Sequence, residues 1–209
     1  MLLNVHVVMF SLSDDALQVL LAPVSATCWE LPGQRVGVDE SLEDAALRVF
    51  NDQFARREIF LEQLYTYGDP KRLPDTRMVS VVYFALIPAG AYRAAGEKLR
   101  WFRVEELPGL AHDHAEIVAY ALRRLRYKLE YSAVGFELLP DEFTLSELQH
   151  TYELILGEKL DKRNFRRRIL DAGIIEETSR RRVGEGRPAR LFRYREDAVA
   201  EVKARRLFP

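Results

Sequence analysis

The chain has 209 residues, of which 48% are hydrophobic and 30% charged, and its formal net charge is −1. This composition is typical of a globular protein with one large domain or two small ones, and the single cysteine, Cys28, excludes an internal disulfide framework. Because no apolar run approaches the roughly 20 residues of a membrane span, and the N-terminus lacks the basic region and cleavage site of a signal peptide, we expect a cytoplasmic protein without a membrane partner.

The first 110 residues predict a set of strands around one helix. Ser41 is a good helix N-cap, and Asp44 three residues later completes a pattern like a capping box. From Leu42 to Phe54 the apolar residues recur at helical spacing, which predicts a helix with one buried face. Strand-like runs cover residues 3–12, 16–22, 59–67, 78–87 and 98–104. Together these elements predict an α+β fold in which helices pack on a mixed sheet.

Residues 33–55, GQRVGVDESLEDAALRVFNDQFA, contain a degenerate signature. The stretch resembles the Nudix box, a loop-helix-loop that binds divalent metal in enzymes hydrolysing nucleoside diphosphates linked to another group. Glu40 and Arg48 are in register with the family pattern. The other positions depart from the pattern. Gln34 replaces the first glycine of the box, and Val49 replaces the first helical glutamate. Asp52 and Gln53 replace the Glu-Glu pair, and Ala55 replaces the last glycine.

These replacements remove most of the metal ligands of the box. Magnesium prefers oxygen ligands, usually including carboxylates, and positions 49, 52 and 53 share one helix face because residues three and four apart are neighbours. Valine has no ligand atom and glutamine is a weak neutral ligand, so Glu40 and Asp52 are the remains of a degenerate metal site. We therefore predict a binding pocket without efficient hydrolysis, with no catalytic residue, no bound metal and no cofactor.

A second helix is predicted near 113–130, where Asp113 and Glu116 repeat the capping-box pattern. Its apolar stripe consists of Val118, Leu122, Leu125 and Leu129. The stripe predicts a helix packed on the sheet, whose length also suits a connector or a dimer contact; a nucleic-acid-binding helix is the alternative. Turn-forming residues near position 140 then divide the chain into a ligand-binding domain, 1–140, and a second domain, 141–209.

The C-terminal third differs in charge and in pattern. From Lys159 onward there are 16 basic residues and 8 acidic ones, which indicates contact with a polyanion. A helix capped by Thr144 is followed by a second helix capped by Asp161, and strand-like runs come next at 174–178 and 189–194. Two helices and a hairpin in this order predict a winged helix-turn-helix domain.

The second of these helices and the hairpin supply the candidate DNA contacts. Early side chains of a recognition helix reach base edges in the major groove, and a Gly-Arg-Pro loop suits a narrow minor groove. The candidates are Lys162, Arg163, Asn164, Arg166 and Arg167 on the helix, and Arg180, Arg181, Arg182, Arg187 and Arg190 in the hairpin and its basic loop. A solvated charged surface is the ordinary alternative, and RNA is the alternative to duplex DNA.

Nearly the whole chain resembles the NrtR family, the Nudix-related transcriptional regulators of NAD metabolism. The resemblance is carried by the segments LPGQ at 31–34, DESLEDAALR at 39–48, YGDPKRLPDTRMVSVVYFALI at 67–87, DHAEI at 113–117, LRRLRYKLEYS at 122–132, DKRNFRRRIL at 161–170 and GRPARLFRY at 186–194. It implies a homodimeric repressor whose Nudix domain, an α/β/α sandwich, binds ADP-ribose or a related NAD metabolite and then releases operator DNA. Other regulators of this group respond to sugars such as arabinose, and some members keep hydrolase activity.

An effector of this kind sets requirements for its pocket. A nucleoside diphosphate needs cationic groups for its phosphates and an aromatic or apolar slot for its base. The candidates are Arg35, Arg48, Arg72 and Arg77 for the phosphates and Tyr67, Phe84 and Trp101 for the base. A structural ion pair is the alternative for Arg48, and core packing is the alternative for the three aromatic residues.

Two rival functions are consistent with the same sequence. One is a Nudix hydrolase that acts on ADP-ribose or a similar compound with an unusual metal site. The other is a metabolite-binding module whose C-terminal domain contacts proteins instead of DNA.

Overall fold

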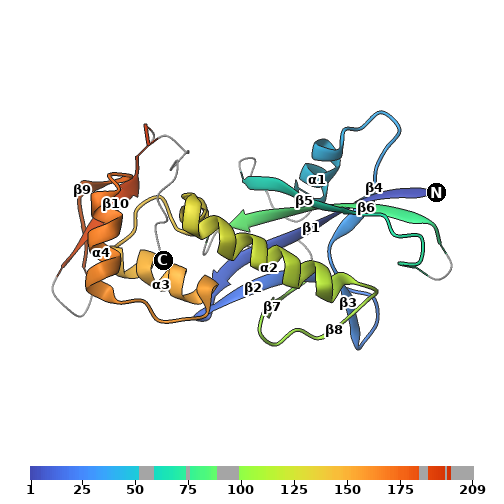
Figure 1. Ribbon diagram of the computed structural model, residues 1–209, viewed down its shortest axis with the longest axis horizontal. Coiled ribbons are helices and arrows are strands. Elements are labelled where there is room, and N and C mark those ends of the chain that lie inside the picture. Colours follow the sequence, from blue (N-terminus) through green and yellow to red (C-terminus); the bar gives the residue numbers. More distant parts are fainter. Residues whose placement is uncertain (52–58, 74–75, 89–98, 184–187, 196, 199–209) are drawn as a thin grey trace. The chain divides into compact units, whose positions relative to one another are not determined.

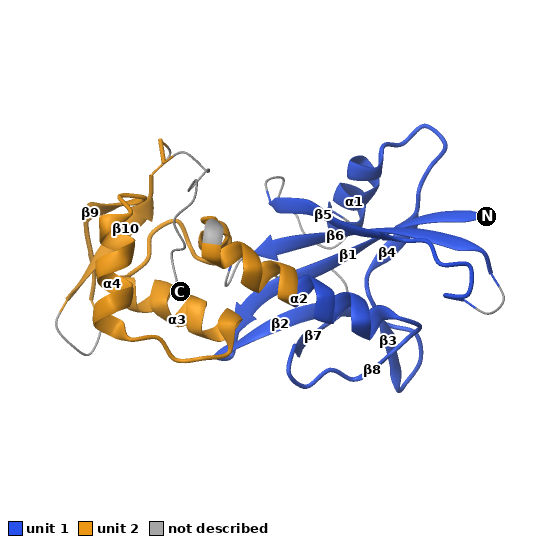
Figure 2. Cartoon of the chain, in the orientation of Figure 1, with its two compact units in different colours: residues 1–122 blue, residues 123–209 orange. Residues whose placement is uncertain are grey.

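The computed structural model describes residues 1–51, 59–73, 76–88, 99–183, 188–195 and 197–198 (Figure 1). The chain divides into two compact units, unit 1 (Met1–Leu122) and unit 2 (Arg123–Pro209), shown in Figure 2. The division falls inside helix α2 (His114–Tyr131), whereas the sequence placed the domain boundary near residue 140. Helix α2 confirms the helix that was predicted near 113–130. Its residues up to Leu122 belong to unit 1, and its residues from Arg123 onward belong to unit 2.

Unit 1 is built on one mixed sheet. Its central strands β1 (Leu2–Ser13) and β6 (Met78–Ile87) pair in parallel, and β5 (Phe60–Tyr67) pairs antiparallel with β6 at one edge. The remaining strands are β2 (Ala16–Pro23), β3 (Cys28–Glu30), β4 (Gly33–Arg35), β7 (Arg100–Arg103) and β8 (Gly109–Leu110). Within the described residues the order is β5-β6-β1-β2-β3-β8, with β4 also paired to β1 and β7 to β2. This mixed sheet confirms the predicted fold class.

Helices cover opposite faces of the sheet (Figure 1). On one face, α1 (Leu42–Asn51) buries Val49 and Phe50 against alternate residues of β1 and β6, such as Val81. Burying a side chain of this size stabilises a fold by about 1.5–3 kcal/mol. Because successive side chains of a strand point to opposite faces, Ser80 points away from α1. The beginning of α2 lies on that second face, which we call the α2 face.

Helices α3 and α4 of unit 2 begin at side chains that cap them. The elements are the end of α2, a short 3-10 helix η1 (Val134–Leu138), α3 (Leu145–Leu156), α4 (Lys162–Asp171), β9 (Ile175–Arg182) and β10 (Ala189–Tyr194). A complete capping box starts α3: the Thr144 hydroxyl accepts from the Glu147 backbone N–H at 3.1 Å, and the Glu147 carboxylate accepts from the Thr144 N–H at 2.7 Å. Gly157 ends α3 in the left-handed conformation, with φ of 77°. The Asp161 carboxylate caps α4 by accepting from the Asn164 N–H at 2.8 Å, so both predicted caps are confirmed.

Strand β9 is longer than the sequence indicated. The predicted run ended at residue 178, but the strand continues to Arg182, and Arg181 lies directly opposite Arg190 on β10. Residues 180–182 therefore belong to a strand and not to the basic loop. Cross-strand ion pairs, such as the 2.9 Å pair between Arg190 and Glu177, replace the apolar alternation by which such strands are usually recognised.

The core of unit 2 joins the two helices to the hairpin. Tyr152 and Ile155 of α3 and Phe165 and Ile169 of α4 are almost completely buried, and Phe192 of β10 is also buried. The rings of Tyr152 and Phe165 meet edge to face, with their centroids 5.5 Å apart. Two helices followed by a two-stranded hairpin confirm the predicted winged helix-turn-helix order. No helix in the described ranges is long and apolar enough to cross a membrane.

Candidate functional site

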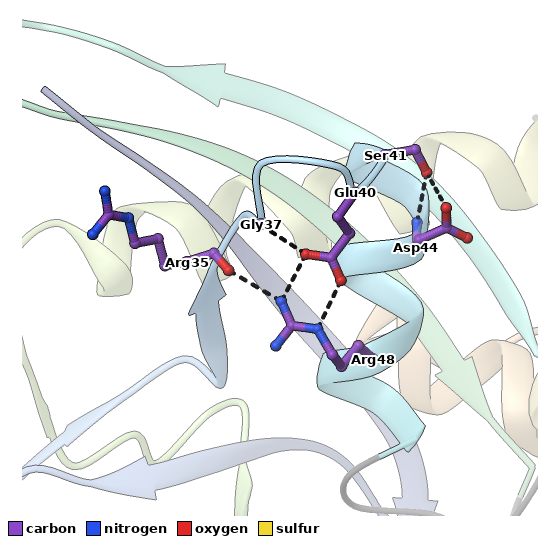
Figure 3. Close-up of polar contacts among 6 residues, drawn as sticks. All are labelled: Arg35, Gly37, Glu40, Ser41, Asp44 and Arg48. Carbon is purple, nitrogen blue, oxygen red and sulfur yellow. Dashed lines mark hydrogen bonds and ion pairs between the residues drawn. The ribbon is translucent and has the colours of Figure 1, made fainter.

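The loop before α1 is closed by an ion pair between Glu40 and Arg48 (Figure 3). The Arg48 guanidinium donates to both Glu40 oxygens, Nε to Oε1 at 2.7 Å and Nη2 to Oε2 at 2.8 Å, and Nη2 also donates to the Arg35 carbonyl at 3.0 Å. The Gly37 N–H donates to the same carboxylate at 2.9 Å. The hydrogen bonds from Arg48 and then from Gly37 lower the pKa of Glu40 to about 2. Glu40 and Arg48, the two residues that match the box pattern, therefore hold the loop together. In this structure Arg48 forms the ion pair that was the alternative to phosphate binding.

The helical positions of the box do not assemble a cluster of ligands in the part of the chain that the structure describes. Val49 is 2% exposed and packs in the core between α1 and the sheet, so this position of the box serves packing. No group of three or more His, Cys, Asp or Glu side chains that could hold a metal ion occurs among the described residues. Asp52, Gln53 and Ala55 lie outside those residues.

A buried polar cluster lies on the α2 face around Arg72. The Arg72 side chain is only 5% exposed, and its guanidinium donates from Nε to the Asp113 carboxylate and from Nη1 to the Ser80 hydroxyl at 2.7 Å. It also lies over the Tyr67 ring, 5.6 Å from the centroid. Burial acts to raise the pKa of Asp113, but the hydrogen bond and charge of Arg72 bring it below its usual range. Arg72 is therefore a cation whose charge is already balanced by a carboxylate at the start of α2.

Two buried histidines extend this cluster to the loop before β4. The rings of His6 and His114 meet edge to face, with centroids 5.0 Å apart, and the Leu31 N–H donates to Nδ1 of His114 at 3.0 Å. Burial is the main cause that lowers the pKa of His6 to about 4 and that of His114 to about 3, so both rings are neutral at pH 7. A Cβ at Gly33 would lie 2.3 Å from Nδ1 of His6, and only glycine fits beside the ring.

His6, Ser80 and Asp113 were not among the predicted site residues. His6 had one signal, because it is a titratable residue in the middle of the apolar run 2–10. A polar group that is buried in such a run must find a partner. The sequence did not reveal what lies beside His6, because His114, whose ring it meets, is far from it along the chain, and the buried Nδ1 of His6 has no hydrogen-bond partner among the described residues.

The sheet separates the predicted effector-binding residues into two groups. Tyr67 lies directly opposite Ser80 in the β5–β6 pairing, so it shares the α2 face with Arg72. Trp101 packs against the core on the α1 side, where Arg48 also lies. The remaining three are placed as follows: Phe84 is completely buried, whereas Arg35 and Arg77 are exposed. The seven residues therefore do not line a single pocket in this structure.

The predicted recognition helix α4 presents its early basic residues to solvent. Lys162 and Arg163 are exposed and form no ion pair within the described ranges. Arg167 is also exposed, and it donates to the Asn164 side-chain carbonyl at 2.9 Å. Arg166 is partly buried and donates to the Ser146 hydroxyl on α3 at 2.9 Å. The first turn of α4 is thus an exposed cationic surface on a well-capped helix.

The predicted hairpin arginines that the structure describes are exposed, and each of them is paired with a carboxylate. Arg180 contacts Glu142 at 3.3 Å, and Arg182 contacts Glu147, the residue that completes the α3 capping box. Glu177 contacts both Arg181, at 3.7 Å, and Arg190, at 2.9 Å. Arg187 lies outside the described residues. A pocket of about 340 Å³ is lined by residues of α3, α4 and the hairpin, among them Ser146, Arg166, Glu177 and Arg190.

Two family models match the chain, one for each predicted domain. The model for the NUDIX domain matches residues 2–125, and the model for the NrtR DNA-binding winged helix domain matches residues 135–194. The first match covers the sheet, α1 and the start of α2. The second covers η1, α3, α4 and the hairpin.

Proteins of other organisms are similar to this chain over most of their own length. The chain is 37% identical over 204 residues to the ADPR responsive transcriptional repressor NtrR of Acinetobacter baylyi, which covers 92% of this chain and 82% of the relative. The structure of this chain is similar to that of Shewanella oneidensis NrtR complexed with a 27mer DNA. The TM-score is 0.88 and the identity is 34%, with full coverage of both chains. The structure is also similar to the NUDIX domain of that protein complexed with ADP ribose, with a TM-score of 0.51 and 31% identity over 60% of this chain and 88% of the other.

Proposed function

The chain belongs to the NrtR family, and from this membership we propose that it is a transcriptional repressor that binds operator DNA and responds to ADP-ribose or a related metabolite. The observation that carries the proposal is the exposed cationic first turn of α4, in a unit of the same order as the winged helix of that family. Early side chains of such a helix reach base edges in the major groove. Arg163 can bind guanine bidentately, and Asn164 can do the same with adenine.

Unit 1 is proposed to bind the effector without consuming it. A hydrolase of this class needs metal-bound carboxylates on the box helix to stabilise the charge that develops on the pyrophosphate. Here Val49 is part of the core, and Glu40 is committed to Arg48 and the Gly37 N–H. These contacts support a structural role for Glu40 and Val49 in place of metal binding. Such a protein can report the concentration of a metabolite, whereas a fast hydrolase would remove its own signal.

The test measures DNA binding and the effector response together. Fluorescence anisotropy with a duplex from the region upstream of the chain's own gene is expected to show sequence-preferring, salt-sensitive binding that ADP-ribose weakens. Arg163→Ala is expected to cost about 1–3 kcal/mol of operator binding and to relax sequence preference. Arg103→Ala, which removes an equal charge from β7, is the matched control. Absence of sequence-preferring binding would contradict the proposal, and a response to arabinose but not to ADP-ribose would change the effector class.

A second measurement addresses the rival enzyme. Incubation of the chain with ADP-ribose and magnesium is expected to yield no efficient turnover. Efficient turnover that is lost in Asp52→Ala would instead identify a hydrolase with an unusual metal site. The proposed assembly is a homodimer, as the family resemblance implies, and light scattering of the free protein would test it.

A further inference from the structure

Two arginines of the hairpin lie side by side with like charges. Arg181 on β9 and Arg190 on β10 are direct partners in the antiparallel pairing, and their side chains are 50% and 63% exposed. Like charges directly opposite each other destabilise a strand pair. An anion between the two guanidinium groups relieves this repulsion.

Glu177 supplies that anion in the free chain. Its Oε1 lies 3.7 Å from Nη2 of Arg181, and its Oε2 lies 2.9 Å from Nη1 of Arg190. Each carboxylate oxygen thus meets a different arginine. A DNA phosphodiester also carries one negative charge and two free oxygens that accept hydrogen bonds from arginine. The Glu177 carboxylate therefore has the charge and the oxygen pair that a backbone phosphate would offer.

We propose that Arg181 and Arg190 form a clamp for one backbone phosphate of duplex DNA, and that Glu177 is the internal carboxylate that the phosphate displaces. This inference rests on the proposed DNA-binding function. Glu177 keeps the two guanidinium groups together in the absence of DNA, so the clamp is preformed. It also competes with the phosphate, so it lowers the affinity for DNA of any sequence.

The displacement has a consequence for the salt dependence of binding. Each phosphate that a cationic side chain neutralises releases counterions from DNA, and the slope of log K against log salt falls by about 0.9 for each phosphate. When Glu177 is displaced, its freed carboxylate takes up cations and offsets part of this release. Operator recognition then depends more on α4 and less on sequence-independent attraction.

The neighbouring residue Glu176 provides a matched control. It lies next to Glu177 on β9, and because successive strand side chains alternate, it points to the other face of the hairpin. There it forms a separate ion pair with Arg193 at 2.5 Å. Glu176→Gln and Glu177→Gln therefore remove the same charge one residue apart, and only the second changes the clamp.

The experiment is an anisotropy titration of the full chain with a mixed-sequence duplex of about 30 base pairs, repeated across salt concentrations. Glu177→Gln is expected to tighten binding by roughly two- to five-fold at low salt, as for a surface ion pair, and to steepen the salt slope by up to about one unit. Glu176→Gln should have a clearly smaller effect. In the double variant Glu177→Gln/Arg190→Ala the gain should disappear, because the clamp has lost one side.

Three outcomes would overturn the clamp. Unchanged or weaker binding by Glu177→Gln would show that the carboxylate does not compete with DNA. Equal gains for Glu176→Gln and Glu177→Gln, or a gain that persists without Arg190, would show a general charge effect. Thermal unfolding of each variant checks that the hairpin is still folded. If the wild type binds no DNA, the proposed function is contradicted as well. If the wild type binds DNA but Glu177→Gln does not change the affinity, only the clamp is contradicted.

Discussion

His6 and His114 make the stability of unit 1 depend on pH. Burial lowers the pKa of both rings below the ordinary value of 6.5, and Arg72 beside them acts in the same direction, although Asp113 opposes it. Between pH 6.5 and the lowered values, the unfolded chain binds more protons than the folded chain. The contribution of these histidines to stability is therefore fully present above pH 6.5 and decreases as the pH falls.

We expect the free energy of unfolding to decrease between pH 6.5 and 5 by up to about 1.4 kcal/mol per pH unit for each histidine. In His114→Asn the decrease should be shallower, because a side-chain oxygen can accept from the Leu31 N–H and does not titrate. Urea unfolding at several pH values measures the slope. His150→Asn on α3, outside the pair, should behave like the wild type. An unchanged slope in His114→Asn would contradict the assignment.

Among the helices, α3 depends most clearly on its cap. Thr144 is 7% exposed, and its hydroxyl and backbone both take part in the capping box with Glu147. Glu147 also holds Arg182 on β9, so the box connects the start of α3 to the hairpin. Loss of the cap should therefore affect both elements.

Thr144→Ala is expected to lower the free energy of unfolding of unit 2 by about 0.5–2 kcal/mol, because one backbone N–H loses its partner. Urea denaturation followed by circular dichroism measures the change. Thr66→Ala at an exposed position of β5 is the control and should stay within about 0.5 kcal/mol of the wild type. A Thr144 effect no larger than that of the control would show that the cap contributes little.

The same elements show what the sequence could predict. Helix α4 was predicted well because Asp161 is a strong capping residue and Phe165 and Ile169 repeat at helical spacing. The end of β9 was predicted too early because its last residues are all arginines, and two of them, Arg180 and Arg182, form ion pairs with residues outside the hairpin. Caps and periodicity are local signals, whereas ion-pair partners depend on how distant segments meet.

The candidate effector site shows the same limit. Tyr67 and Trp101 were both sound choices by residue type, but Tyr67 lies opposite Ser80 and Trp101 lies opposite Leu20, on different faces of the sheet. The alternation within one strand can be read from the sequence. The register between strands cannot be read in this way, because it is set by pairing across long stretches of chain.

For the whole molecule, the proposed function requires that effector and operator oppose each other. If ADP-ribose weakens DNA binding by a given factor, DNA must weaken ADP-ribose binding by the same factor, because the coupling free energy belongs to both ligands. Calorimetric titration of ADP-ribose with and without operator duplex, compared with anisotropy titration of DNA with and without ADP-ribose, gives both factors. We expect them to agree, at roughly 5- to 150-fold. Independent binding of the two ligands would contradict a response through the protein.

Helix α2 begins in unit 1 and ends in unit 2 without a break. In its second half, Arg126 donates to the Ile155 carbonyl of α3 at 2.7 Å. This carbonyl is one of the last four of α3, which have no partner inside their own helix. A winged helix separated from the chain at residue 135 or 141 would therefore lose a donor that belongs to its own unit, and a separately produced unit 2 has to begin before Arg126.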